Sequence, residues 1–261
     1  MLGVADRFTF EAVDAFDYEE LRPGYAPEAV EWVSKRSGIV PGSLVVDLAA
    51  GTGQLSRLFV ALGVDVVAVE PASNMRWVLT RQVPEVRAVD GTAESMPLDD
   101  STVDAVVVGN AFHHFVREEA FAEIRRVLKP GATLALFWAW PLEERSLHLP
   151  WIQEVDAVVE TARASHDIAT AYRGWKAPPE TAAGFGPFER REFLVTHTVA
   201  SARIADLYAT SSDVASLPSE TRAALLDRVR ELTRDQPPVL HLPGRSVVDL
   251  CRRAESHDGK T

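Results

Sequence analysis

The sequence predicts an α/β protein built on a mostly parallel sheet with helices on both faces. Short apolar runs lie along the chain from residue 44 to residue 138, and amphipathic stretches separate most of them. Such runs are typical of strands that are buried on both faces, and the stretches between them are typical of helices that connect parallel strands. The length of 261 residues suits one large domain with an insertion.

A helix is expected before the first strand. Pro27 opens an amphipathic segment with apolar residues at Val30 and Val33, and Gly38 marks its end. Proline suits the first turn of a helix because its missing N–H has no partner there. The segment therefore predicts a helix with one buried stripe.

Strands and helices are expected to alternate from residue 43 onward. The expected strands cover residues 44–48, 64–69, 86–89, 103–108, 133–138, 188–199 and 246–251. The expected helices cover residues 54–62, 73–79, 117–128, 151–163 and 225–232. Ser73 is expected to cap the second of these helices.

The regular alternation stops between residues 141 and 187, which are rich in Trp, His, Pro and Gly. We therefore expect three parts in this chain. They are a sheet domain of residues 1–140 and 188–252, an inserted cap of residues 141–187, and a flexible tail of residues 253–261.

Charge and composition exclude several classes of protein. The net charge of −11 argues against a nucleic-acid partner, which needs Lys and Arg to replace phosphate counterions. The longest apolar run, residues 132–142, is too short for a membrane span, and we expect no secretory signal because no apolar stretch follows a basic N-terminus. Cys251 alone allows no internal disulfide. We expect a cytoplasmic protein without membrane partners, and interpret the pairs Arg125-Arg126 and Arg190-Arg191 as solvated surface.

The main chemical signal follows the first strand. The segment from Asp47 to Gln54 (DLAAGTGQ) has glycines that let a ligand approach the backbone, and it opens a helix whose free N–H groups favour anions. About 20 residues on, Glu70 ends the second strand, where a carboxylate can accept both hydroxyls of a ribose. A nicotinamide-dependent oxidoreductase is the weaker interpretation, because Ala49 and Ser56 stand where its fingerprint has glycine.

Two later segments of the sequence follow the glycine turn and Glu70 in a fixed order along the chain. Residues 91–98 (GTAESMPL) precede the fourth strand, and residues 126–131 (RVLKPG) precede the fifth. Together with the glycine turn and Glu70, they resemble the class I S-adenosylmethionine-dependent methyltransferases. The resemblance is strongest to the family that includes ubiquinone/menaquinone C-methyltransferases and trans-aconitate methyltransferase. It covers residues 14–138, continues loosely to 252, and leaves the cap uncovered.

The resemblance implies a doubly wound, Rossmann-like, seven-stranded sheet with an antiparallel last strand. It also implies S-adenosyl-L-methionine as cofactor, S-adenosyl-L-homocysteine as product, and no metal. The implied cofactor-binding residues are Tyr18, Arg22, Asp47, Ala49, Gly51, Thr52, Gln54, Glu70, Pro71, Met75, Thr92, Ala93, Glu94, Asn110 and Ala111.

Several of these residues have an implied role. Glu70 would hold the ribose hydroxyls, and Pro71 and Met75 would pack on the adenine. Tyr18 and Arg22 resemble an N-terminal element that closes over the cofactor and meets its carboxylate. Ala49 replaces the usual glycine, and we expect a mild effect because alanine fits there if its φ is negative.

His113 is the candidate catalytic residue, as a general base or a hydrogen-bond donor to the methyl acceptor. It follows the fourth strand, at the edge where open α/β sheets bind ligands, and an ordinary histidine pKa suits proton transfer. The alternative is a structural histidine bonded to a backbone carbonyl. His114 is expected to point elsewhere, and neither histidine belongs to a metal-ligand cluster.

Aromatic residues concentrate near the cap and suggest an acceptor pocket. The candidate substrate-binding residues are His113, Trp138, Trp140, Tyr172 and Trp175. They predict a small apolar or aromatic substrate, although the same rings could form the cap's own core. A binding or assembly subunit without methyl transfer remains the alternative function. The acceptor atom, and the choice between monomer and homodimer, stay open.

Overall fold

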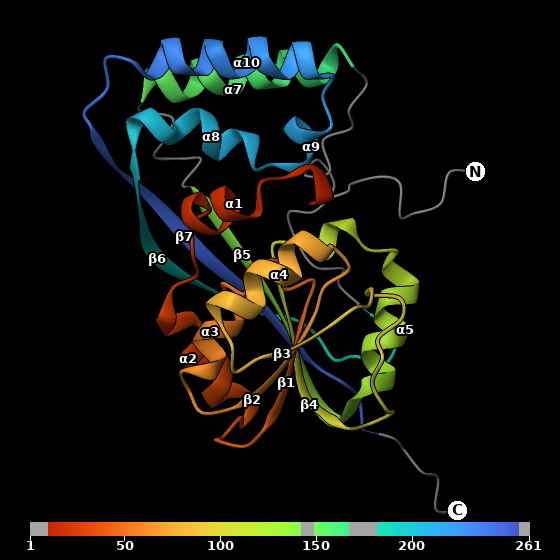
Figure 1. Ribbon diagram of the computed structural model, residues 1–261. Helices are drawn as coiled ribbons and strands as arrows, with labels where there is room; N and C mark the ends of the chain where they lie inside the picture. The colour runs from red at the N-terminus through yellow and green to blue at the C-terminus, as the bar shows by residue number, and fades with distance from the viewer. Residues whose placement is uncertain (1–9, 142–148, 167–181, 256–261) are drawn as a thin grey trace, which may run out of the picture.

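The computed structural model describes residues 10–141, 149–166 and 182–255 (Figure 1). One sheet of seven strands has the order β3-β2-β1-β4-β5-β7-β6. The strands are β1 (Leu44–Leu48), β2 (Asp65–Val69), β3 (Arg87–Val89), β4 (Val103–Gly109), β5 (Leu128–Pro141), β6 (Glu189–Ala200) and β7 (Val239–Arg252). Only β7 pairs antiparallel, with β5 and β6, so the predicted fold class is confirmed.

Each expected helix is present in the described ranges, together with shorter helical segments that the sequence does not predict. They are η2 (Phe10–Ala12), α1 (Ala15–Leu21), α2 (Pro27–Ser37), α3 (Ser56–Val60), α4 (Ser73–Gln82), η3 (Phe112–His114), α5 (Arg117–Val127), α7 (Pro150–Ala164), η5 (Ser201–Arg203), α8 (Ile204–Ala209), α9 (Ser212–Ala215) and α10 (Ser219–Thr233). No helix in the described ranges is long and apolar enough to cross a membrane.

Alternating strand residues face two separate cores. Val46 and Leu48 of β1 pack in the core that contains Ile124 of α5. Val45 of the same strand packs in the other core with Phe59 of α3. Because successive side chains of a strand point to opposite faces, helices cover both sides of the sheet.

The order of the strands creates a crevice beside β1. The chain runs outward from β1 through β2 to β3, and it then returns to β4 on the other side of β1. The carboxyl ends of these parallel strands share one edge of the sheet. Open α/β sheets bind ligands outside the carboxyl ends of their strands at such a switch point.

A helical layer lies above this edge of the sheet (Figure 1). Helix α7 packs on α10, and a shared core includes Val155 and Val159 of α7, Ile204 of α8, and Leu225 and Val229 of α10. Strands β6 and β7 rise from the sheet to this layer. The cap that we expect at residues 141–187 thus shares its core with helices from residues 204–233.

Several expected boundaries are wrong. Helix α3 begins at Ser56 rather than at residue 54, and β5 and β7 are longer than predicted. Ser73 is not the cap of α4, because Ala72 occupies the N-cap position. The Ser73 backbone N–H instead donates to the Glu11 carboxylate at 2.6 Å. A carboxylate from the N-terminal segment therefore serves the start of α4.

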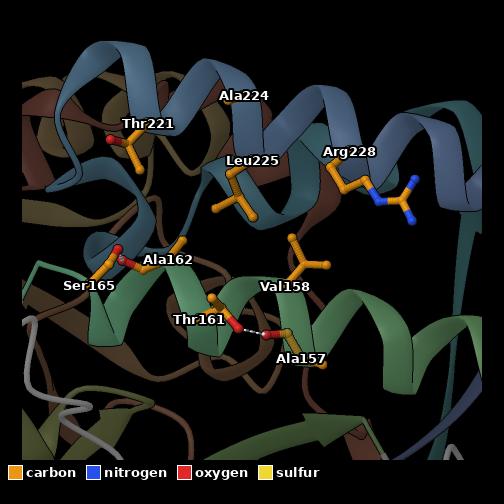
Figure 2. Close-up of a pocket in the computed structure, with 9 residues that line it drawn as sticks. All are labelled: Ala157, Val158, Thr161, Ala162, Ser165, Thr221, Ala224, Leu225 and Arg228. Atoms are coloured by element: carbon orange, nitrogen blue, oxygen red, sulfur yellow. Dashed lines mark hydrogen bonds between the residues drawn. The ribbon is translucent and has the colours of Figure 1, made fainter.

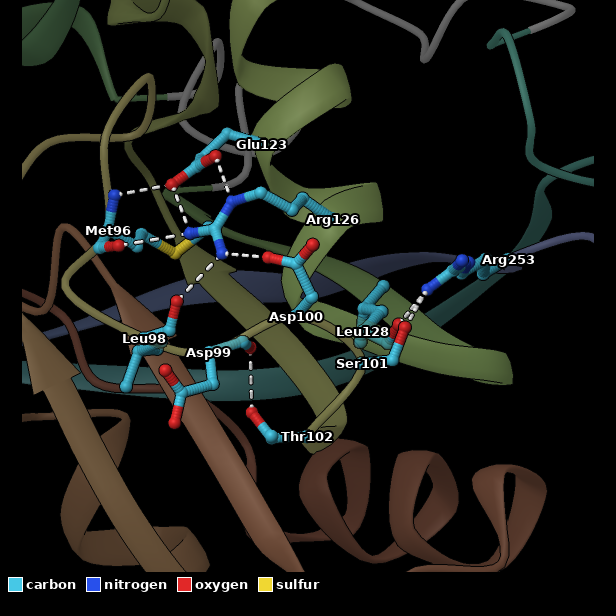
Figure 3. A network of polar contacts seen from close by, with 10 residues as sticks. All are labelled: Met96, Leu98, Asp99, Asp100, Ser101, Thr102, Glu123, Arg126, Leu128 and Arg253. Atoms are coloured by element: carbon cyan, nitrogen blue, oxygen red, sulfur yellow. Dashed lines mark hydrogen bonds and ion pairs between the residues drawn. The ribbon is translucent and has the colours of Figure 1, made fainter.

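Two arginines interpreted as solvated surface are ion-paired instead. Arg126 donates to Glu123 Oε2 at 2.7 Å, to Asp100 Oδ1 at 2.6 Å and to the Leu98 carbonyl at 2.8 Å, and these bonds fix the loop before β4 (Figure 3). Arg190 of β6 forms a bidentate pair with Asp249 of β7, at 2.6 and 2.8 Å. Both arginines therefore hold elements together.

Candidate active site

The glycine turn after β1 has an unusual backbone. Ala49, Gly51 and Gly53 have φ values of 55°, 58° and 88°. Glycine adopts this left-handed region freely, whereas a Cβ makes it costly. The expectation of a negative φ at Ala49 is therefore wrong, because the turn keeps the glycine conformation with alanine in place.

Glu70 joins the end of β2 to this turn. Its Oε2 accepts a hydrogen bond from the Gly51 N–H at 2.9 Å, and its Oε1 accepts one from the Ala72 N–H at 2.8 Å. The residue is 5% exposed, and burial raises its pKa although the two N–H donors oppose this rise. Each carboxylate oxygen still has a lone pair for a ligand hydroxyl.

Two further polar side chains of the turn are buried. Asp47 Oδ2 accepts a hydrogen bond from Ser56 Oγ at 2.6 Å. Burial raises the pKa of Asp47 to about 7, against the opposing effect of the Ser56 hydroxyl. Asp47 Oδ1 and Thr52 Oγ1 have no hydrogen-bond partner among the described residues. Buried polar atoms of this kind are expected to meet a ligand or a water molecule.

The candidate adenine-binding residues lie on the loops after β2 and β3 and in the first turn of α4. Met75 is 1% exposed, whereas Pro71 is exposed. Thr92 and Ser95 exchange backbone hydrogen bonds at 3.1 and 3.2 Å, which close a tight turn around the buried Ala93. Glu94 accepts a hydrogen bond from the Val116 N–H at 2.9 Å, so its carboxylate holds the start of α5.

The N-terminal segment contacts the glycine turn. A Cβ at Gly51 would lie 3.8 Å from Tyr18 Cε1, and the Arg22 guanidinium lies 5.3 Å from the centre of the Tyr18 ring. Gln54 Nε2 donates to the Glu19 carbonyl at 3.1 Å and to the Arg22 carbonyl at 3.4 Å. The structure thus brings Gln54 to Tyr18 and Arg22, which lie more than 30 residues earlier in the sequence.

The segment after β4 places two histidines side by side. Asn110 has a φ of 50°, and its Oδ1 accepts from the Ala139 N–H at 2.8 Å, while Ala111 precedes η3. The ring centres of His113 and His114 are 3.9 Å apart, so His114 does not point elsewhere as expected. Burial lowers the pKa of His113 to about 3 and that of His114 to about 4. Both rings are neutral at physiological pH, which removes the ordinary pKa on which the general-base interpretation rested.

The candidate acceptor residues are only partly described. Trp138 is 4% exposed, and its ring centre lies 5.9 Å from that of His113. The Trp140 side chain, Tyr172 and Trp175 lie outside the described residues. Trp151 packs against the core of α7, α8 and α10, so this ring contributes to packing of the cap.

A separate cavity of about 400 Å³ lies between α7 and α10 (Figure 2). Its lining consists of Ala157, Val158, Thr161, Ala162, Ser165, Thr221, Ala224, Leu225 and Arg228. Thr161 Oγ1 donates to the Ala157 carbonyl at 2.8 Å, and Arg228 pairs with Glu231 at 2.9 Å. These polar groups are thus engaged within their own helices, and the cavity offers no cluster for chemistry.

Two residues near the site were not anticipated. Asn74 Nδ2 donates to the Phe10 and Val13 carbonyls, both at 3.0 Å, and so ties the N-terminal segment to α4. Thr210 accepts a hydrogen bond from Arg22 Nε at 2.8 Å across 188 residues of sequence. No local pattern signals such contacts. In the described ranges, no group of three His, Cys, Asp or Glu side chains could hold a metal ion.

Comparisons with known proteins agree with this arrangement. Residues 46–136 match the family model described as "Methyltransferase domain". An uncharacterized methyltransferase of Mycobacterium tuberculosis is 35% identical over 241 residues, which cover 91% of each chain. A demethylmenaquinone methyltransferase of Renibacterium salmoninarum is 37% identical over 100 residues, 38% of this chain and 42% of its own.

A solved structure shares the fold over most of its length. A type II methyltransferase from Anaeromyxobacter dehalogenans superposes with a TM-score of 0.56 and 23% identity, over 90% of this chain and 98% of its own. The sheet order, the glycine turn at the switch point and the full-length relative point to the same conclusion. The chain belongs to the class I S-adenosylmethionine-dependent methyltransferases.

Proposed function

We propose that the protein binds S-adenosylmethionine at the switch point and transfers its methyl group to a small apolar or aromatic metabolite. The observation that carries this proposal is the Glu70 carboxylate, buried at the end of β2 and bonded to the Gly51 N–H of the glycine turn. A carboxylate in this place suits the two hydroxyls of a ribose. The likeness to a demethylmenaquinone methyltransferase supports an aromatic acceptor.

The residues present fit this cofactor. Glu70 would hold the ribose, and the buried Asp47 Oδ1 and Thr52 Oγ1 would gain the partners they lack among the described residues. Tyr18 and Arg22 would cover the amino-acid part from the N-terminal side. Met75 and Ala93 would face the adenine. The remaining proposed contacts are Ala49, Gln54, Pro71, Thr92, Glu94, Asn110 and Ala111.

The bound cofactor supplies a methyl carbon on a sulfonium, which is already a good leaving group. Glu70, the glycine turn and the N-terminal segment would hold the cofactor so that an acceptor could take up this methyl group, and an O–H or N–H acceptor would release its proton to water. The protein then has to align the acceptor and exclude water, and alignment can contribute roughly 7–11 kcal/mol. The segment after β4 and the cap of residues 141–187 are the elements we propose for this task.

His113 is proposed to form a hydrogen bond with the acceptor rather than to remove its proton. Burial lowers its pKa to about 3, so the protonated imidazole that a general base must form would be unfavourable at neutral pH. A neutral ring still offers one donor and one acceptor. Trp138, whose ring is close to His113, would form part of the acceptor wall together with Trp140, Tyr172 and Trp175.

Calorimetric titration tests the proposal. We expect S-adenosylhomocysteine to bind the unaltered protein with one-to-one stoichiometry and NADH not to bind. Glu70→Ala should weaken binding by about tenfold or more, since it removes a charged hydrogen-bond acceptor. Glu85→Ala, a change at an exposed residue after α4, should leave binding unchanged. Binding of NADH, or no binding of S-adenosylhomocysteine, would contradict the proposal.

Methyl transfer itself needs a second assay. Release of S-adenosylhomocysteine would be measured with quinols, phenols and aromatic amines as acceptors, and with polar aliphatic amines and carboxylic acids for comparison. Turnover with any of them supports the acceptor class. Turnover confined to polar aliphatic acceptors would exclude it.

A further inference from the structure

The guanidinium of Arg22 is fixed on one side only. Its Nε donates to Thr210 Oγ1 at 2.8 Å, and its carbon lies 5.3 Å from the centre of the Tyr18 ring. An arginine has five N–H donors, and four of them belong to Nη1 and Nη2. In the part of the chain that the structure describes, neither of these nitrogens has a hydrogen bond or an ion pair.

The acidic residues beside Arg22 are committed to other arginines. Asp17 pairs with Arg203 at 2.6 Å, and Glu19 pairs with Arg57. Glu20 also approaches Arg203, at 3.4 Å. Arg22 is half-buried and keeps its positive charge among these neighbours. A half-buried guanidinium with unused parallel N–H groups is suited to a carboxylate ligand.

Thr210 holds its hydroxyl in one orientation. The residue follows α8, is 1% exposed, and donates its single hydroxyl hydrogen to the Leu207 carbonyl at 2.6 Å. Its backbone N–H also bonds the preceding turn, to the carbonyls of Asp206 and Leu207 at 3.2 Å each. With the hydrogen used, the oxygen can only accept, and it faces Arg22 Nε.

We propose that Thr210 is a positioning residue that aims Arg22 at the carboxylate of the cofactor's amino-acid part. This inference rests on the proposed function. Gln54 ties the Arg22 carbonyl to the glycine turn, and Tyr18 lies between Gly51 and the guanidinium, so Arg22 stands beside the turn. Because Thr210 belongs to the helical layer above the sheet, that layer takes part in holding the cofactor.

Two ligands separate this role from a general loss of structure. S-adenosylhomocysteine has the carboxylate, whereas 5′-methylthioadenosine has the same nucleoside and thioether without the amino-acid part. Thr210→Val should weaken S-adenosylhomocysteine binding by about tenfold, the effect of one hydrogen bond to a charged group, and leave methylthioadenosine binding unchanged. Thr210→Ser should restore the affinity, because it restores the hydroxyl.

Thr233→Val is the matched control. Thr233 is 4% exposed, and its hydroxyl bonds only carbonyls of its own helix, such as that of Val229 at 3.0 Å. We expect this variant to keep both affinities. An equal loss of affinity for both ligands in Thr210→Val, or an unchanged affinity for both, would overturn the positioning role. Failure of the unaltered protein to bind S-adenosylhomocysteine would instead overturn the proposed function, and the inference with it.

Discussion

Ala49 occupies a backbone conformation that suits glycine. A left-handed φ costs an L-residue about 1–2 kcal/mol, and part of this cost is offset because alanine restricts the unfolded chain more than glycine does. Ala49→Gly should therefore raise the free energy of unfolding of the ligand-free protein by about 0.5–1 kcal/mol. Urea denaturation monitored by circular dichroism measures this change.

The neighbouring alanine provides the control. Ala50 does not have a positive φ, so Ala50→Gly gains nothing in the folded state and increases the freedom of the unfolded chain. It should lower stability. Equal effects of the two substitutions would show that the strain at Ala49 is not significant.

The burial of His113 leads to a prediction about its pH dependence. His113→Gln keeps a hydrogen-bonding side chain and should retain most of the turnover, whereas His113→Ala should lower kcat by about tenfold. Because the pKa of His113 is lowered to about 3, kcat/KM should show no inflection from this residue between about pH 5 and 8. Kinetics with an acceptor from the screen would provide these values.

A general base would behave differently. Glutamine could not take up a proton, so kcat would fall about a hundredfold or more in both variants. The pH profile of the unaltered protein would show an inflection near the ordinary histidine pKa, and this inflection would be absent from both variants. That result would contradict the hydrogen-bonding role. Unchanged kcat in His113→Ala would exclude both roles.

At the residue level, the sequence predicts site residues that lie close together along the chain. It does not predict properties that depend on residues distant in sequence. The glycine turn and Glu70 stand within about 20 residues of each other, where a known spacing applies. The pKa of His113, by contrast, depends on burial by segments distant in sequence. The φ of Ala49 follows from the turn as a whole rather than from the preference of alanine.

At the level of elements, a buried carboxylate of β7 forms an ion pair with β6. Asp249 is 0% exposed, and Arg190 on the neighbouring strand is its bidentate partner. Arg190→Met should lower the free energy of unfolding by about 2–3 kcal/mol, somewhat less than for a fully buried pair because the arginine side chain is 40% exposed. Urea denaturation would detect this loss.

Arg191→Met is the comparison at the next position of the same strand. The Arg191 guanidinium lies over the rings of Trp32 and Phe193, at 5.7 and 5.3 Å from their centres. Its replacement should therefore lower the free energy of unfolding by about 0.5–1 kcal/mol. The double variant Arg190→Met with Asp249→Leu should recover much of the loss, because no charge is left unpaired. Similar losses in all three variants would rule out the ion pair as the cause.

The sequence predicts those elements that have a clear periodicity of their own. Strands β1, β2 and β4 are short apolar runs, and α2 and α5 are amphipathic, so their positions follow from local pattern. The outer parts of β5 and β7 were missed because residues 138–141 pair with residues 244–247, far along the chain. Helices α8 and α9, with six and four residues, are too short for a periodic signal.

For the whole molecule, the N-terminal segment connects the sheet to the helical layer. Residues of α1 bond Gln54 and Arg57 on one side and Arg203 on the other.

S-adenosylhomocysteine at a hundred times its Kd should raise the free energy of unfolding by about 2.7 kcal/mol. Hydrogen exchange should slow most in α1 and in residues 49–54 together, and in α10 by no more than the global change in stability. Protection of the turn without α1 would contradict closure by this segment.

The helical layer is assembled from two stretches of chain, residues 150–164 and 201–233, between which β6 returns to the sheet. The helical layer of a relative therefore cannot be transferred to this protein by replacing one continuous segment after β5. A chimera that replaces only residues 141–187 would set a foreign α7 against the native α10, and their apolar surfaces would not match. An exchange of the cap that we propose to bind the acceptor therefore requires both stretches to be replaced together.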